Sequence, residues 1–233
     1  MPTLPVEYRI PEIRPCDFIH CVRGIYDVLD NKHTSKTVDD PFMRAILTRH
    51  SKLSEAEWRA AELCRLKQKA LEMKVGYFHE ELMGKFPGYE TLPNGHVSGC
   101  DVRKLDGTVI FEVKNRYNTV KGSDGKHVIE RLAKLRSAGV RAIFAQINCE
   151  SGKVNRYGGP PEMDIWDGRQ VYAFLSGRAS FFDDLRRTLE WAFTMDLHQL
   201  QSALGVAAYD AGAHAVDDRP STANLPHRAA ACT

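Results

Sequence analysis

The feature that most constrains the fold of this 233-residue chain is a strand-forming segment whose two halves meet at an Asp-Gly pair. The first half reads His96-Val-Ser-Gly-Cys-Asp-Val-Arg. The second reads Thr108-Val-Ile-Phe-Glu-Val-Lys and is rich in the β-branched and aromatic residues that favour strands. Between them, Lys104-Leu-Asp-Gly is typical of a tight turn. The segment therefore predicts a β-hairpin.

Helical patterns stand on both sides of this hairpin. Apolar residues at spacings of three and four predict a helix from about Leu53 to Phe86, which opens with a possible capping box at Ser54 and is ended by Pro87-Gly88. After the hairpin, a polar loop over residues 115–125 leads to a helix over residues 126–137. An apolar strand follows, from Arg141 to Asn148. The predicted order is helix, hairpin, helix, strand.

The remaining chain predicts smaller elements and a tail. Residues 163–166 indicate a short strand, Asp167-Gly168 a turn, residues 171–175 a short helix or strand, and residues 181–200 an amphipathic helix. After about Leu204 the composition becomes alanine-rich, without a periodic apolar face. We expect one domain over residues 1–204, with a helical N-terminal part, and a flexible tail over residues 205–233.

Composition excludes some classes of protein and leaves others open. No apolar run approaches the roughly 20 residues that span a bilayer, and the N-terminus shows no secretory signal, so we expect a cytoplasmic protein. The six cysteines form no CxxC pair and are expected to be reduced. Cys16, His20 and Cys21 lack a second ligand pair for zinc. A net charge of +2 leaves nucleic-acid binding open.

Three charged residues of the hairpin form a candidate catalytic group. Asp101 and Glu112 lie on opposite arms, so strand pairing can bring both carboxylates to the same end of the sheet. Lys114 shares a strand face with Glu112, while Val113 points into the core and can offer its backbone carbonyl. Such oxygen ligands suit Mg²⁺, and phosphodiester cleavage needs a cation and an activated water.

The Glu-x-Lys spacing alone is weak evidence, because it arises by chance about once in a chain of this length. The sequence contains its own controls. Glu72-Met-Lys74 has the same pattern but lies within the predicted helix, and Asp124-Gly-Lys126 lies in a loop without a preceding strand. Only Glu112-Val-Lys114 combines the pattern with a strand. Exposed charges at the end of a strand are the alternative.

Asp101 followed by Glu112-Val-Lys114 resembles the PD-(D/E)xK nuclease signature. The run from Glu112 to Ser123, with Gly76-Tyr-Phe-His-Glu-Glu-Leu upstream, is similar to type II restriction endonucleases that cut GGNCC-like palindromes. The likeness covers roughly residues 70 to 180, departs from the signature at Cys100, where the family name has proline, and leaves the residues before about Leu53 unmatched. It implies an α/β protein with a restriction-endonuclease-like fold, a central mixed β-sheet flanked by helices.

The resemblance also implies roles for individual residues. Asp101 and Glu112 would ligate Mg²⁺, and Lys114 would orient or help to deprotonate the attacking water. Many such folds add a glutamate from the helix before the hairpin, for which Glu81 is preferred over its neighbour Glu80. The polar loop after the catalytic strand would contact DNA through Asn115, Arg116, Asn118, Thr119, Lys121, Ser123 and Lys126.

These expectations describe a Mg²⁺-dependent, sequence-specific endonuclease that acts on double-stranded DNA. A palindromic target would imply a two-fold homodimer in which each subunit cuts one strand. Two alternatives stay open: a structure-specific or repair nuclease of the same fold, and a DNA-binding module that has lost catalysis.

Overall fold

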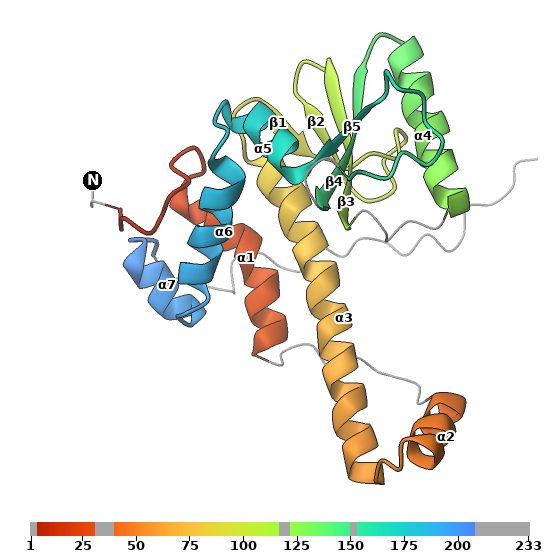
Figure 1. Cartoon of the computed structure of the whole chain (residues 1–233). Coiled ribbons are helices and arrows are strands. Elements are labelled where there is room, and N and C mark those ends of the chain that lie inside the picture. Colours follow the sequence, from red (N-terminus) through yellow and green to blue (C-terminus); the bar gives the residue numbers. More distant parts are fainter. Residues whose placement is uncertain (1–3, 31–39, 117–121, 150–152, 208–233) are drawn as a thin grey trace, which may run out of the picture.

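A five-stranded mixed sheet with helices on both faces forms the centre of the protein, and this confirms the predicted α/β class (Figure 1). The computed structural model describes residues 4–30, 40–116, 122–149 and 153–207. In spatial order the strands are β1 (Tyr89–Thr91), β2 (Val102–Lys104), β3 (Val109–Arg116), β4 (Arg141–Asn148) and β5 (Asp164–Asp167). Strand β2 pairs antiparallel with both β1 and β3, whereas β4 pairs parallel with both β3 and β5.

The predicted hairpin is formed by β2 and β3. Its register pairs Val102 with Phe111, and the turn closes with a hydrogen bond from the Gly107 amide to the Lys104 carbonyl at 2.9 Å. Gly107 has a φ of 74°, a conformation that glycine adopts without strain. Strand pairing begins only at Val102, later than the predicted start at His96, and the three-residue strand β1 was not predicted.

The long predicted helix before the hairpin is α3 (Glu55–Gly84). Its capping box is confirmed, because the Glu57 amide donates to the Ser54 hydroxyl and the Ser54 amide donates to the Glu57 carboxylate. Figure 1 shows α3 extending from the sheet toward α2 (Pro41–His50), a helix without a buried residue. Trp58 is buried at this end of α3, so α2 and the start of α3 form an arm away from the sheet.

Two apolar clusters cover the two faces of the sheet. On one face, α4 (Gly122–Ser137) packs its buried residues Val128, Ile129 and Leu132 against β3 and β4. On the other face, Phe111 and Val113 of β3 pack with α3, with the segment over residues 8–13 and with four further helices. These helices are α1 (Pro15–Leu29), α5 (Gly168–Ser176), α6 (Phe181–Ala192) and α7 (Leu197–Ala203). Strand β3 therefore lies between two cores.

Two predicted elements of the C-terminal half were wrong. Asp167-Gly168 is not a turn, because Asp167 caps α5 and Gly168 is the first residue of that helix. A Cβ at Gly168 would lie 2.5 Å from the Ile147 carbonyl oxygen, so the close approach requires glycine. The predicted helix over residues 181–200 is divided into α6 and α7. At the interruption, the Ala192 carbonyl accepts from the Met195 amide at 3.2 Å and from the buried Tyr26 hydroxyl at 2.7 Å.

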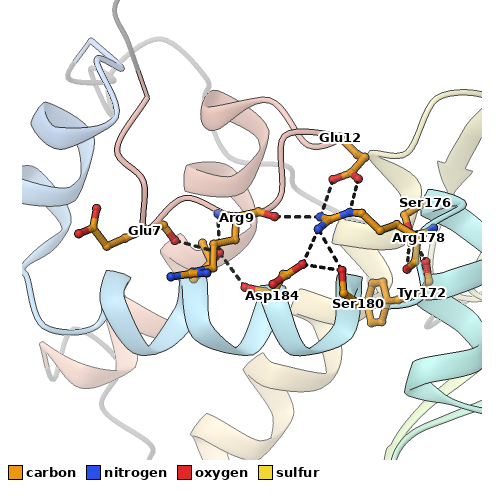
Figure 2. A network of polar contacts seen from close by, with 9 residues as sticks. Glu7, Arg9, Glu12, Tyr172, Ser176, Arg178, Ser180 and Asp184 are labelled. Carbon is orange, nitrogen blue, oxygen red and sulfur yellow. Dashed lines mark hydrogen bonds and ion pairs between the residues drawn. The ribbon is translucent and has the colours of Figure 1, made fainter.

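A polar network centred on Arg178 ties the N-terminal segment to α5 and α6 (Figure 2). The Arg178 guanidinium donates to the Glu12 carboxylate at 2.8 Å and to the Arg9 carbonyl at 2.8 Å. It also pairs with Asp184, whose carboxylate accepts from Ser180 at 2.8 Å. The network therefore joins residues that lie more than 160 positions apart in the sequence.

No helix within the described ranges combines the length and the apolar character that crossing a bilayer requires.

Candidate active site

Asp101 lies immediately before β2 and opposite Glu112 when the hairpin register is continued by one residue. Its main-chain amide donates to the Phe111 carbonyl at 2.9 Å, and its Oδ2 accepts a hydrogen bond from the Val113 amide at 2.6 Å. The Asp101 carboxylate thus accepts the hydrogen bond that a main-chain carbonyl would accept in a regular pair of strands. This fixes the Asp101 carboxylate next to residues 112–114.

Glu112 and Lys114 point to the same face of β3, as the strand period predicts. The Lys114 Nζ lies 2.6 Å from Glu112 Oε1 and 4.0 Å from Asp101 Oδ2, and it donates to the Val113 carbonyl oxygen at 2.9 Å. The Glu112 side chain is only 5% exposed. The candidate site is therefore built on a central strand, and not at an exposed strand end.

The second oxygen of Glu112 has its own partner. Arg131 of α4 places its Nη2 2.6 Å from Glu112 Oε2. Glu112 thus lies between two cations, Lys114 on Oε1 and Arg131 on Oε2. Sequence analysis did not find Arg131, because its helix position carries no pattern that relates it to the hairpin.

The oxygens around Lys114 Nζ fit a hard cation. Asp101 Oδ2, Glu112 Oε1 and the Val113 carbonyl converge on one positive charge, which the ammonium group supplies in this structure. Carboxylate and carbonyl oxygens are the donors that Mg²⁺ accepts. Among the described residues, no three His, Cys, Asp or Glu side chains are placed to hold a metal ion alone, so the candidate set needs the main-chain carbonyl and water.

Glu80, and not Glu81, is the helix glutamate beside this site. Burial and the charges of Asp101, Glu112 and Glu81 raise the Glu80 pKa to about 7, against an opposing effect of Lys114. Glu81 instead lines a cavity of about 620 Å³ with residues of α1, including Cys21. These surroundings favour Glu80 over the predicted Glu81 as the additional glutamate, since successive helix residues face directions about 100° apart.

The electrostatics show that the carboxylates crowd one another. Burial and the nearby Glu112 raise the Asp101 pKa to about 6, although Lys114 and the Val113 amide act in the opposite direction. Burial lowers the Lys114 pKa, but the charges of Glu112 and Asp101 outweigh that effect and raise it. A site that raises the pKa of its acids in this way would be stabilised by an additional cation.

The predicted DNA-contacting residues divide into three groups. Asn118, Thr119 and Lys121 lie outside the described residues, as does the side chain of Ser123. Lys126 is exposed on α4. Asn115 and Arg116 line a cleft of about 340 Å³ between the ends of β3 and β4 and the helix α3.

Partners from other elements hold the residues of this cleft. The Asn148 amide donates to Asn115 Oδ1 at 2.5 Å, and Arg116 pairs with Glu72 at 3.3 Å. Glu72 belongs to Glu72-Met-Lys74, the Glu-x-Lys pattern that sequence analysis excluded as a catalytic candidate because it lies in a predicted helix. It indeed lies on α3, but it contacts one of the predicted DNA-binding residues.

Comparison with known proteins agrees with this geometry. The sequence pattern of the family described as Eco47II restriction endonuclease matches residues 16–149, more than half of the chain. The chain belongs to this family. The match begins at α1, so it includes the N-terminal helices that sequence analysis left without a relative.

Two curated relatives are similar to the chain. The type II restriction enzyme Sau96I of Staphylococcus aureus is 33% identical over 123 residues, which are 50% of this chain and 46% of that enzyme. The type II restriction enzyme Eco47II of Escherichia coli is 28% identical over 205 residues, which are 79% of this chain and 83% of that enzyme. The family and the mixed sheet flanked by helices together identify a restriction-endonuclease-like fold.

Proposed function

We propose that this member of the restriction endonuclease family hydrolyses phosphodiester bonds of double-stranded DNA at a specific sequence and that it requires Mg²⁺. The observation that supports this most is the convergence of Asp101 Oδ2, Glu112 Oε1 and the Val113 carbonyl on one positive charge. The relatives named as type II restriction enzymes support the reaction class.

Each residue has a task in this proposal. Asp101 and Glu112 hold the cation, and the Val113 carbonyl completes the protein's donor set. When it is bound, Mg²⁺ supplies charge neutralisation at the scissile phosphate and the leaving oxygen. Lys114 orients the attacking water through its ammonium group and stabilises the negative charge that develops on the water oxygen as the proton passes to bulk water.

The substrate and the assembly follow from the same proposal. The cleft that contains Asn115 and Arg116 begins one residue beyond Lys114, so DNA bound there lies next to the reacting groups. Arginine and asparagine are suited to guanine and adenine edges and to phosphates. A short palindromic target would be cut by a homodimer, in which each subunit acts on one strand. Sedimentation equilibrium would measure this dimer directly.

Digestion of a phage genome with and without Mg²⁺, followed by sequencing of the fragment ends, tests the function. We expect discrete ends that share one short palindrome, and no cutting without the cation. A smear of unrelated ends would instead indicate a structure-specific or repair nuclease. Binding of DNA without any cutting would indicate a module that has lost catalysis.

Variants of the two carboxylates test the site. We expect Asp101→Asn and Glu112→Gln each to lower the single-turnover cleavage rate by a factor on the order of 10² or more, because each removes a charged donor for the cation. The amides keep the shape of the side chains. Glu130→Gln is the matched control, since Glu130 is an exposed acid of α4 that pairs with His127. Near-normal cutting by either active-site variant would refute the assignment.

A further inference from the structure

Arg131 reaches the candidate site from a helix that packing holds in place. Its neighbours Val128 and Leu132 are buried in the cluster that joins α4 to β3 and β4, with exposures of 6% and 0%. The backbone of Arg131 is therefore fixed relative to the strand that carries Glu112. Its guanidinium then places Nη2 2.6 Å from Glu112 Oε2.

Arg131 also packs against the segment that carries Asp101. A Cβ at Gly99 would lie 2.9 Å from both the Cζ and the Nη1 of Arg131, so only glycine leaves room for the guanidinium. Gly99 has a φ of 64° and stands two residues before Asp101. Arg131 thus lies against both the catalytic strand, through an ion pair with Glu112, and the segment that leads into β2, through close approach to Gly99.

The Arg131 side chain is 35% exposed, but one of its nitrogen atoms is buried and makes no hydrogen bond. Its Nε is buried without a hydrogen-bond partner, whereas its Nη2 makes a short contact with the carboxylate. A buried donor without a partner costs stability. The guanidinium therefore leaves its Nε without a partner, while its Nη2 fixes the position of Glu112 Oε2.

We propose that Arg131 is a positioning residue that holds the Glu112 carboxylate so that Oε1 faces the cation site. This inference rests on the proposed function and adds a residue to it. With Oε2 held by Arg131, the carboxylate plane cannot turn, and Oε1 stays directed toward the point where Asp101 Oδ2 and the Val113 carbonyl meet. Partners of this kind typically change metal affinity or activity 10–100-fold when they are removed.

The test uses Arg131→Lys, which keeps the positive charge but loses the planar fork that reaches Oε2. Mn²⁺ binding to the full-length, DNA-free protein is measured by titration calorimetry, next to the melting temperature in EDTA. We expect Mn²⁺ affinity to fall about ten-fold or more, with the melting temperature little changed. Arg136→Lys is the matched control, because Arg136 lies on the same helix but pairs with Asp164.

A second variant approaches the contact from the other side. Gly99→Ala leaves Arg131 in place but forces its guanidinium to move, so Mn²⁺ affinity should fall here as well. Gly95→Ala is the control for backbone strain, because Gly95 also has a positive φ but an added Cβ there meets no atom within 4 Å. This variant decides the question if Arg131→Lys does not fold. The proposal would be overturned if the folded Arg131→Lys protein bound Mn²⁺ as tightly as the parent. If only Gly99→Ala folds, parent-like Mn²⁺ affinity in that variant would overturn it.

The calorimetry also separates this proposal from the proposed function. A parent protein that binds Mn²⁺ but does not cut DNA would refute the endonuclease function, while the role of Arg131 would still be decided by the Mn²⁺ affinities. A parent protein that does not bind Mn²⁺ would refute both.

Discussion

Glu80 and Glu81 are adjacent in the sequence but face different surroundings. Glu80 lies among the charges of Asp101, Glu112 and Lys114, whereas Glu81 lines the cavity next to α1. We expect Glu80→Gln to lower the single-turnover cleavage rate about ten-fold and Glu81→Gln to change it less than about two-fold. The two variants remove the same charge from neighbouring positions. Equal losses would show that the effect comes from the helix and not from the site.

The same pair shows why the candidate site could be predicted only in part. Strand alternation and the hairpin turn suffice to bring Asp101, Glu112 and Lys114 together, because these are local relations of period two. The choice between Glu80 and Glu81, and the arrival of Arg131, depend on how α3 and α4 rotate about their axes on the sheet. That rotation is set by packing between distant residues.

The buried His79 makes the stability of the protein depend on pH. Burial lowers its pKa from 6.5 to about 4, and its Nδ1 lies 2.8 Å from the Tyr172 hydroxyl. Because the folded state resists protonation, the unfolded state takes up the proton first as pH falls below 6.5. The contribution of His79 is therefore present at neutral pH and is lost through the window from about 6.5 to about 4.

Urea unfolding of the parent and of His79→Gln at about pH 7.5 and about pH 5 measures this effect. We expect the parent to lose about 2 kcal/mol more than the variant between these two pH values, from the pKa difference between the folded and unfolded states. Asp101 and Glu80 also titrate in this range, but they are present in both proteins and largely cancel. Parallel pH profiles for the two proteins would contradict the assignment.

At the scale of elements, long and periodic segments were predicted well and short ones were not. The capped helix α3 and the apolar strand β4 carry their signals within one segment, and β4 has the predicted bounds. Strand β1, only three residues long, is held by pairing with β2 and has no pattern of its own. Between α6 and α7, Asp196 caps the second helix, and Tyr26 of α1, which no local pattern relates to this point, donates to the Ala192 carbonyl.

The Arg178 network joins elements from the two ends of the described chain and should contribute to stability. Arg178→Ala removes the contacts with Glu12, Asp184 and the Arg9 carbonyl, which leaves two partly buried carboxylates without their cation. We expect a loss of about 1–3 kcal/mol in the free energy of unfolding, with the cleavage rate per folded molecule unchanged. Arg186→Ala is the control, since Arg186 forms an exposed pair with Glu190 on the same helix. If both variants lost the same free energy of unfolding, the Arg178 network would contribute no more to stability than one exposed ion pair.

At the scale of the whole molecule, both ends of the described chain complete one core. Residues of α1 and α7 belong to the same apolar cluster as Phe111 and Val113 of the catalytic strand. The family match, which begins at residue 16, agrees with a domain that needs its N-terminal helices.

The last prediction concerns truncation at the C-terminus. Leu200 and Leu204 are 0% and 3% exposed, and the Val206 amide donates to the Gln201 carbonyl at 2.9 Å, so α7 and the residues just after it are part of the core. The alanine-rich residues 208–233 have no periodic apolar face in the sequence. A protein that ends after Ala207 should therefore keep the parent's melting temperature and Mg²⁺-dependent cleavage. A protein that ends after Asp196 loses both leucines, each of which contributes about 2–5 kcal/mol when it is buried, and should be largely unfolded. Thermal unfolding and single-turnover cleavage of the two truncated proteins measure this difference, and loss of cleavage in the longer one would assign a role to residues 208–233.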